Sequence, residues 1–301
     1  MDELVTNLGN LPHLESIHLS SLMAPPRHPE LDAFSSPSTL LPFIARIDII
    51  GDLVGCLAFL TKLTYPNTAT VSINCFPSGY TDNVMPSVRD LITTINAKNI
   101  VPITSLYVEN RYQAMTFRGQ DAQGIERVFV LFQNYSLQPS GISWDSFALH
   151  HLKSLRVIGF KILPSVWLSV FGKLKKLKTI LIIHHASEFI DVLSCGISRD
   201  SAVTSSPGKL NFSALKSLSL SGTLGRHYGE RPRAESLASC FRERRRRGLT
   251  LRRLCIESHG GSADVVCELS SFIKHVKWTE IPEEETSDEE SDNDDYDDED
   301  E

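Results

Sequence analysis

The pattern of apolar and polar positions is clearest in residues 149–183. Leu149, Leu152, Leu155 and Val157 follow one another at steps of three, three and two residues. The same steps recur in Leu174, Leu177, Ile180 and Ile182. Three-residue steps are typical of a chain that turns tightly, and a two-residue step is typical of a strand with alternate side chains on one face. The segment is therefore predicted to be a strand, a short helix and a second strand.

The same spacing recurs along the whole chain. Complete copies begin at Leu11, Leu41 and Ile100, and weaker copies lie at 71–73, 212–220, 251–256 and 273–278. Their third positions advance by 22 to 38 residues, except for one step of 49 residues. Strand–helix units of this length are typical of leucine-rich repeats. The predicted fold is α/β, an irregular leucine-rich-repeat solenoid with a curved parallel sheet and outer helices. It is irregular because the usual Asn or Cys after each strand is missing.

Two further patterns place helices and an insertion. Val88, Leu91, Ile92 and Ile95 have the spacing of one helix face, and a second helix is predicted over 234–247, ending before a glycine. The 49-residue step contains two strand-like segments separated by the turn-rich sequence GQDAQG. Residues 115–132 are therefore predicted to form an inserted hairpin.

Charge divides the chain into two parts. Residues 283–301 hold 14 acidic residues and no basic residue, so the net charge of −7 becomes −7 + 14 = +7 without them. We expect one leucine-rich-repeat-like domain over 1–282 and a disordered acidic tail over 283–301, because the tail cannot bury enough apolar surface to fold. Three roles stay open for this tail: screening the basic domain, contacting basic partners, or adding solubility.

Cysteine spacing and the length of the apolar runs indicate the cell compartment in which the protein is expected. The six cysteines are scattered without a CxxC spacing, as expected for reduced thiols rather than a disulfide framework or a zinc site. The first residues do not have the pattern of a signal segment, and the apolar runs are too short to span a bilayer. These features predict a cytoplasmic or nuclear protein without a membrane partner.

Candidate chemistry is sparse. The sequence contains no nucleotide-binding, nucleophile-elbow or zinc-protease motif. His184 and His185 follow a predicted strand, and a surface position is favoured over a metal site because such sites need three or four converging ligands. We therefore predict no catalytic residue, no cofactor and no metal, and a protein that is not an enzyme.

A binding surface is the stronger prediction. On each predicted strand, the residues beside the inward apolar positions face the inner side of the sheet. The residues predicted to contact a partner are Arg46, Asp48, Tyr107, Glu109, Arg156, Leu181, Arg253 and Glu257. Tyrosine and arginine are common anchors in protein interfaces, so the expected partner is a protein. The alternative is an ordinary solvated face.

A basic tract and two serines complete the candidates. The tract comprises Arg242, Arg244, Arg245, Arg246 and Arg247. It could bind nucleic acid or, with the acidic tail, histones in the nucleus. The favoured interpretation is a helix C-terminus in which cations stabilise the helix dipole. Ser287 and Ser291 each have acidic residues one and three positions later, which predicts phosphorylation by an acid-directed kinase.

One stretch resembles a known family. The sequence AESLASCFRERRRRGLTLRRLCIE is similar to the C-terminal part of F-box proteins of mushroom-forming fungi. The matching positions are Leu237, Cys240, Phe241, Arg244, Gly248, Leu251, Leu254 and Ile256. The resemblance, which extends over 1–282, implies a leucine-rich-repeat receptor that holds a target for ubiquitination while its F-box docks on a Skp1-type adaptor. No F-box precedes the repeats, which begin by Leu8. The chain is therefore either a truncated receptor or a binding module without ligase recruitment.

Overall fold

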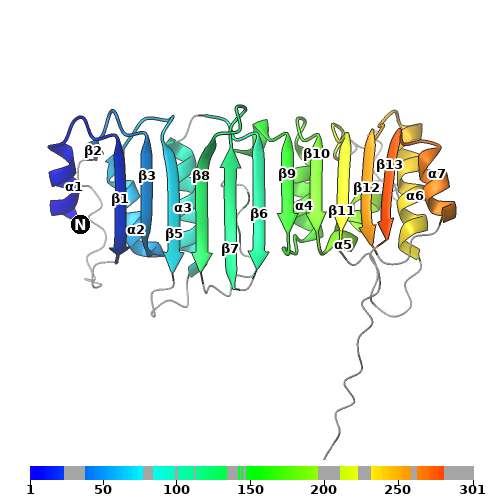
Figure 1. The fold of residues 1–301 in the computed structure, drawn as a ribbon, viewed down its shortest axis with the longest axis horizontal. Helices are drawn as coiled ribbons and strands as arrows, with labels where there is room; N and C mark the ends of the chain where they lie inside the picture. Colours follow the sequence, from blue (N-terminus) through cyan, green and yellow to red (C-terminus); the bar gives the residue numbers. More distant parts are fainter. Residues whose placement is uncertain are drawn as a thin grey trace, which may run out of the picture.

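One large open sheet, with helices on one of its faces, dominates the structure (Figure 1). The structure is a computed structural model that describes residues 1–23, 38–76, 84–98, 101–111, 113–133, 142, 144, 147–195, 211–222, 232–258 and 263–280. The sheet has 11 strands, and a separate pair is formed by two short strands near the N-terminus. The predicted mixed α/β class with a mostly parallel sheet is confirmed.

The elements alternate between strands and helices for most of the chain. The helices are α1 (Asp2–Gly9), α2 (Leu53–Thr61), α3 (Val84–Lys98), α4 (Pro164–Ser169), α5 (Ala186–Cys195), α6 (Pro232–Arg246) and α7 (Ala263–Ser270), with short 3-10 turns η3 (Leu149–His151) and η4 (Phe171–Lys173). The large sheet contains β1 (Ser16–Leu22), β3 (Arg46–Asp52), β5 (Thr70–Phe76), β6 (Ser105–Arg111), β7 (Ala114–Gln120), β8 (Glu126–Gln133), β9 (Ser154–Ile158), β10 (Thr179–Ile183), β11 (Ser217–Ser221), β12 (Arg253–Ser258) and β13 (His275–Glu280). The small pair is β2 (Thr39–Leu40) and β4 (Leu63–Thr64).

The strand order departs from chain order at one place. From the N-terminal edge the order is β1-β3-β5-β8-β7-β6-β9-β10-β11-β12-β13. In a solenoid stacked strictly in chain order β6 would lie beside β5, but β8 pairs with β5 here, in parallel. β7 and β8 are the antiparallel pair of the predicted hairpin, and they fill the sheet between β5 and β6. Only β7 runs against the others in this sheet.

A buried carboxylate shapes the turn that allows this insertion. Asp121 accepts hydrogen bonds from the backbone N–H groups of Gln123 (2.9 Å) and Ile125 (3.0 Å) and from Nε of Arg127 (2.8 Å). Gly124 takes a left-handed conformation with φ +80°. Arg127 also donates to the Thr68 carbonyl at 2.5 Å, immediately before β5. The turn and the neighbouring strand are therefore held together by one arginine.

The apolar residues of the repeated spacing form the core, on the face of the sheet that the helices cover. In β5, Val71, Ile73 and Cys75 are buried while the residues between them are half-buried, and β8 and β11 alternate in the same way. Behind the centre of the sheet, aromatic rings fill space between the helices: Trp144 contacts Phe117, Phe160 and Phe171 with ring centres 5.3–6.2 Å apart. Burial of alternate positions leaves the opposite face of the sheet as the accessible one.

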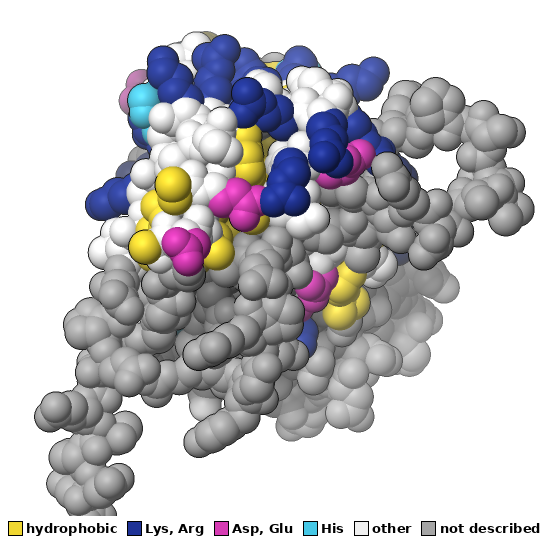
Figure 2. Space-filling model, turned by 90° about the vertical axis from the view of Figure 1, so that its right-hand side faces the viewer, with side chains coloured by type: hydrophobic (Ala, Val, Ile, Leu, Met, Phe, Trp, Pro, Cys, Tyr) yellow, Lys and Arg dark blue, Asp and Glu magenta, His cyan; other side chains and the backbone are white. Residues whose placement is uncertain are grey.

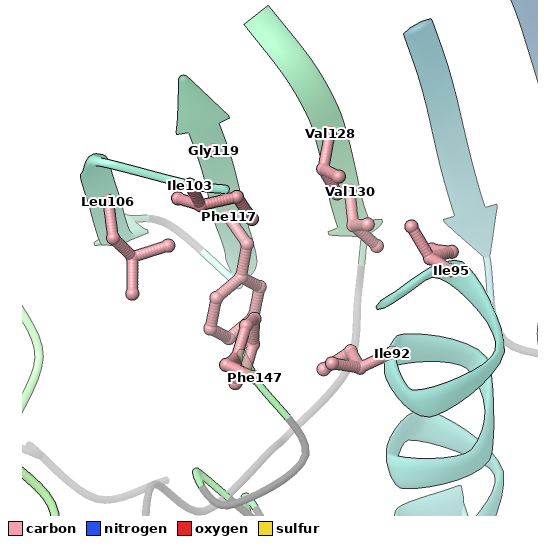
Figure 3. Close-up of a pocket in the computed structure, with 9 residues that line it drawn as sticks. All are labelled: Ile92, Ile95, Ile103, Leu106, Phe117, Gly119, Val128, Val130 and Phe147. Atoms are coloured by element: carbon pink, nitrogen blue, oxygen red, sulfur yellow. The ribbon is translucent and has the colours of Figure 1, made fainter. Parts of the chain in front are cut away.

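A small cavity lies behind the inserted strands (Figure 3). Its volume is about 10 Å³, and it is enclosed by Ile92, Ile95, Ile103, Leu106, Phe117, Gly119, Val128, Val130 and Phe147. This space could hold at most one water molecule, and its lining offers no polar side chain to bind one. It is a packing gap between α3 and strands β6, β7 and β8, and nothing in it resembles a ligand site.

Candidate functional site: the open face of the sheet

The register of the sheet arranges the accessible side chains in rows. The central row runs across all 11 strands: His18, Asp48, Ser72, Phe129, Arg118, Tyr107, Arg156, Leu181, Ser219, Cys255 and Lys277. Neighbours in such a row are about 4.8 Å apart, because that is the distance between paired strands. The row therefore forms a continuous strip, which we call the central row.

The middle of this row is a set of alternating cations and rings. Arg118 lies over the Phe129 ring, with 5.1 Å from its guanidinium carbon to the ring centre, and over the Tyr107 ring at 5.6 Å. Arg156 approaches the Tyr107 ring from the next strand, at 5.3 Å. Each contact at this distance contributes about 0.5–1 kcal/mol at an exposed site. These four side chains from β8, β7, β6 and β9 form what we call the arginine–aromatic cluster.

Glu109 fixes the phenol of this cluster. The Tyr107 hydroxyl donates to Oε2 of Glu109 at 2.6 Å, and the other oxygen of Glu109 forms an ion pair with Arg111. Partial burial and the Glu109 carboxylate raise the pKa of Tyr107, so the phenol stays protonated at neutral pH. The ring is thus held in one orientation before any partner arrives, which lowers the entropy cost of binding.

The residues predicted from the sequence fall into three separate places on this face. Tyr107, Glu109, Arg156 and Leu181 lie on the neighbouring strands β6, β9 and β10. The remaining four are Arg46, Asp48, Arg253 and Glu257. Strands β3 and β12 are each four strand positions from β6, which corresponds to about 19 Å.

The two outer pairs differ from the central group in their contacts. Nε of Arg46 is 2.7 Å from Oδ2 of Asp48, so these two charges neutralise each other near the N-terminal edge. Arg253 and Glu257 are exposed on β12 and lie two rows apart on the same strand. The structure therefore does not bring the eight predicted residues into one site.

Arg118 and Phe129 are the central residues that the sequence analysis missed. Both lie in the hairpin predicted over 115–132, outside the repeated apolar spacing. The signal was nevertheless present, because Phe129 stands between the buried residues Val128 and Val130, and Arg118 stands between Phe117 and Gly119. Strand alternation alone places them on the accessible face.

The basic tract is occupied by contacts within the protein. Arg244 is 4% exposed and donates to the backbone carbonyls of Asn211 (3.0 Å) and Phe212 (2.8 Å). Burial lowers the pKa of this guanidinium. Its neighbours also have partners: Arg242 pairs with Glu268, Arg246 and Arg247 pair with Glu243, and Arg245 donates to the Ser271 carbonyl.

The tract also ends its helix as the sequence indicates. The N–H of Gly248 (φ +79°) donates to the Arg245 carbonyl at 2.9 Å, and the N–H of Leu249 donates to the Arg244 carbonyl at 2.9 Å. This pair of bonds is the usual glycine-based helix ending. Ser287 and Ser291 lie outside the described residues.

The motif that carries the family resemblance has a structural role at every position. Leu237, Cys240, Phe241, Leu251, Leu254 and Ile256 are buried in the core, Arg244 bonds the backbone, and Gly248 ends the helix. The motif describes how α6 connects to β12. It therefore carries no information about a bound target.

Within the described part of the chain, no three His, Cys, Asp or Glu side chains gather as metal ligands, and no helix is long and apolar enough to cross a membrane. His184 and His185 both have positive φ angles, 64° and 52°, at the end of β10, and both are exposed. Comparison with known proteins gives no match to a family, to a curated protein or to a solved structure.

Proposed function

We propose that this chain is a non-catalytic protein-interaction module that binds its partner on the open face of the sheet, with the arginine–aromatic cluster at the centre. The observation that carries the proposal is the row formed by Phe129, Arg118, Tyr107 and Arg156 on four neighbouring strands. Tyrosine and arginine in a pre-ordered, partly desolvated patch are the residue types that dominate binding energy in protein interfaces.

The surroundings of the cluster fit a protein partner. Leu181 continues the row beside Arg156, and Leu131 lies beside Phe129 two residues along β8. Apolar side chains next to the stacked arginines supply area to bury, while the arginine N–H groups remain available to donate to a carboxylate or a backbone carbonyl of the partner. An extended or flat protein surface fits such a strip better than a small molecule, which needs a concave pocket.

We further propose that the fold is an irregular leucine-rich-repeat solenoid. Support comes from the five successive parallel strands β9–β13, which pair in chain order. The three-three-two spacing of apolar residues is complete at β9, β10 and β11, and β12 and β13 keep its last three positions. The resemblance to fungal F-box proteins then suggests a place in ubiquitin ligation, as the part that holds a target. Residues 1–301 contain no F-box, so this chain by itself should not bind a Skp1-type adaptor. Pull-down of the adaptor by the chain would contradict this view.

The binding proposal is tested with peptide selection on the intact protein. A displayed random-peptide library is selected on the immobilised full chain, and binding of the selected peptides is measured by calorimetry. Arg118→Ala with Phe129→Ala should weaken binding at least about tenfold, because two anchor residues contribute about 1–2 kcal/mol each. Arg253→Ala with Glu257→Ala, on the same face but about 19 Å away, is the matched control and should change binding less than about twofold.

Hydrogen exchange adds a second readout. A bound peptide should slow exchange in β6–β9 and leave β12 unchanged. Peptides that bind equally well to the cluster variant, or that protect only the helical side, would show that the open face is not the binding surface.

A further inference from the structure

A row of cations lies along one edge of the sheet. In β9–β13, the first paired residues are Ser154, Thr179, Ser217, Arg253 and His275, which stand side by side. The residues immediately before them are all basic: Lys153, Lys178, Lys216, Arg252 and Lys274. Because these five strands are parallel, the five cations share the amino-terminal edge, about 4.8 Å from one to the next. We call this row the cationic ladder.

The backbone holds the ladder at a fixed spacing. The N–H of each of Lys178, Lys216 and Arg252 donates to the carbonyl of the preceding ladder residue, in each case at 2.8 Å. Lys216 is half-buried, and the other four side chains are exposed. Among the residues that the structure describes, none of the five has a carboxylate partner. Within the described ranges, the positive charge of this edge is therefore not compensated by ion pairs, in contrast to Arg242, Arg246 and Arg247 of the basic tract.

A groove continues the ladder at the C-terminal end of the sheet. It has a volume of about 360 Å³, and Arg245, Arg252 and Lys274 line it together with Leu251, Phe272 and Ile273. Figure 2 looks onto this end of the molecule and shows Lys and Arg side chains gathered in its upper part, where Figure 1 places the amino ends of the strands. An open groove that combines three cations with apolar and hydroxyl side chains suits a polypeptide that carries acidic side chains.

We propose that the cationic ladder and this groove bind an extended acidic polypeptide, and that the occupant is the chain's own segment 283–301. This segment holds 14 acidic residues and no basic residue, whereas residues 1–282 carry a net charge of +7. Tethering raises its effective concentration at the ladder to about the millimolar range, so free acidic peptides compete poorly.

The tail is long enough to reach the ladder. β13 ends at Glu280, at the opposite edge of the sheet, and its six residues span about 20 Å. Extended chain returns over that distance in about six or seven residues. The remaining residues of 283–301, about fourteen of them, can cover the ladder, which is about 19 Å long.

The same edge is poorly suited to nucleic acid. Binding of single strands normally relies on aromatic rings on which the bases stack. Of the residues next to the ladder, namely Ser154, Thr179, Ser217, Arg253 and His275, only His275 carries a ring. The backbone N–H groups of Lys178, Lys216 and Arg252 are already bonded along the ladder and cannot hold a phosphate. Lysines that act as separate point charges match a string of flexible carboxylates.

The test joins carboxylates to lysines in the intact full-length protein with a zero-length carbodiimide reagent. Trypsin then releases the whole tail in one peptide, because no Lys or Arg follows Lys277. At low salt we expect the tail to be linked, within single molecules, to Lys153, Lys178, Lys216 and Lys274. Lys161 is the matched control in a Glu188→Gln background, because it follows β9 at the edge from which the tail starts and its Nζ otherwise pairs with Glu188 at 3.3 Å. It should be linked at least about fivefold less. Salt at about 0.5 M should remove the preference, because it screens exposed charges.

A binding measurement gives an independent result. In a variant of the full chain, Asn and Gln replace the acidic residues of 283–301, and circular dichroism checks that the fold is kept. This variant should bind poly-glutamate at least about tenfold more tightly than the native chain. The gain should disappear when Lys178→Gln, Lys216→Gln and Lys274→Gln are added.

Three outcomes would overturn the proposal. They are linkage of the tail to Lys161 as often as to the ladder, linkage only between separate molecules, and equal poly-glutamate affinity for the native and neutralised chains. Binding of a 20-residue oligodeoxythymidine probe by the native chain through the same lysines, more tightly than poly-glutamate binds the neutralised chain, would instead show that the edge is a nucleic-acid site.

Discussion

Within the basic tract, Arg244 is the residue for which the structure assigns a role that differs most from the one its sequence suggests. In the sequence it is one of five arginines in six residues, and all of them look like candidates for an anionic partner. In the structure it is 4% exposed and holds the Asn211 and Phe212 carbonyls, which lie just before β11. Replacing it should therefore destabilise the fold, and replacing its exposed neighbours should not.

The magnitude follows from the lost bonds. Hydrogen bonds from a charged donor contribute about 1.5–3 kcal/mol each, and Arg244→Ala leaves the buried Phe212 carbonyl and the partly buried Asn211 carbonyl without this donor. We expect a loss of about 3 kcal/mol in the free energy of unfolding. Arg246→Ala is the matched control, since this side chain is 68% exposed and makes only a 3.5 Å ion pair with Glu243. Exposed pairs of this kind contribute at most about 1 kcal/mol.

Urea unfolding followed by circular dichroism measures both variants. With a denaturant slope of about 3 kcal/mol per molar, Arg244→Ala should lower the midpoint by about 1 M and Arg246→Ala by less than about 0.3 M. Arg244→Lys should fall between them, because lysine keeps the charge but lacks the planar fork that reaches both carbonyls. Equal midpoints for the Arg244→Ala and Arg246→Ala variants would refute the structural role of Arg244.

Three other predictions concern the turn, one glycine and the thiols. Burial by itself raises the pKa of Asp121, but its hydrogen bonds lower it below the usual value, so its contribution is present above about pH 4 and is lost as the pH falls further. Asp121→Asn should therefore lower the melting temperature at pH 7 and flatten its dependence on pH below about pH 4. A variant whose melting temperature falls with pH below about pH 4 as steeply as that of the native protein would contradict this. Gly159 has φ +60°, and a Cβ there would lie 2.3 Å from the Asn110 carbonyl oxygen, so Gly159→Ala should cost more than about 2 kcal/mol in urea unfolding. The exposed Cys267 should react with a thiol reagent in the native state, while the buried Cys75, whose pKa is raised by its contact with another thiol and by burial, should react only after unfolding.

Local patterns gave reliable predictions for individual elements. The strands around Ile47, Leu155 and Ile180 were predicted from apolar spacing, and the structure has them as β3, β9 and β10. The helix α3 follows from the spacing of Val88, Leu91, Ile92 and Ile95. Such elements are readable because burial of one face imposes a period of two or of 3.6 residues on the sequence itself.

The order of the strands is a different kind of property. The sequence shows two strand-like segments at 115–132 but does not show which strand each one pairs with. β8 pairs with β5 through backbone hydrogen bonds, which do not depend on side-chain identity, so no pattern of apolar residues could reveal the pairing. The position of this hairpin decided the candidate site, because it brings Arg118 and Phe129 beside Tyr107.

What the sequence determined by itself was the strands of the large sheet, most of the helices between them, and the contrast in charge between residues 1–282 and 283–301. Helix α1 and the short pair β2 and β4 were not predicted. Only the tertiary structure decided that Phe129, Arg118, Tyr107 and Arg156 form one row, that Arg244 is buried while its neighbours are paired at the surface, and that five cations align along one edge. The physical reason is that the alternation of buried and accessible residues along a strand is a local pattern, which neighbouring residues show directly. The register between strands depends on how backbones far apart in the chain pair, and that is settled only when the whole sheet assembles.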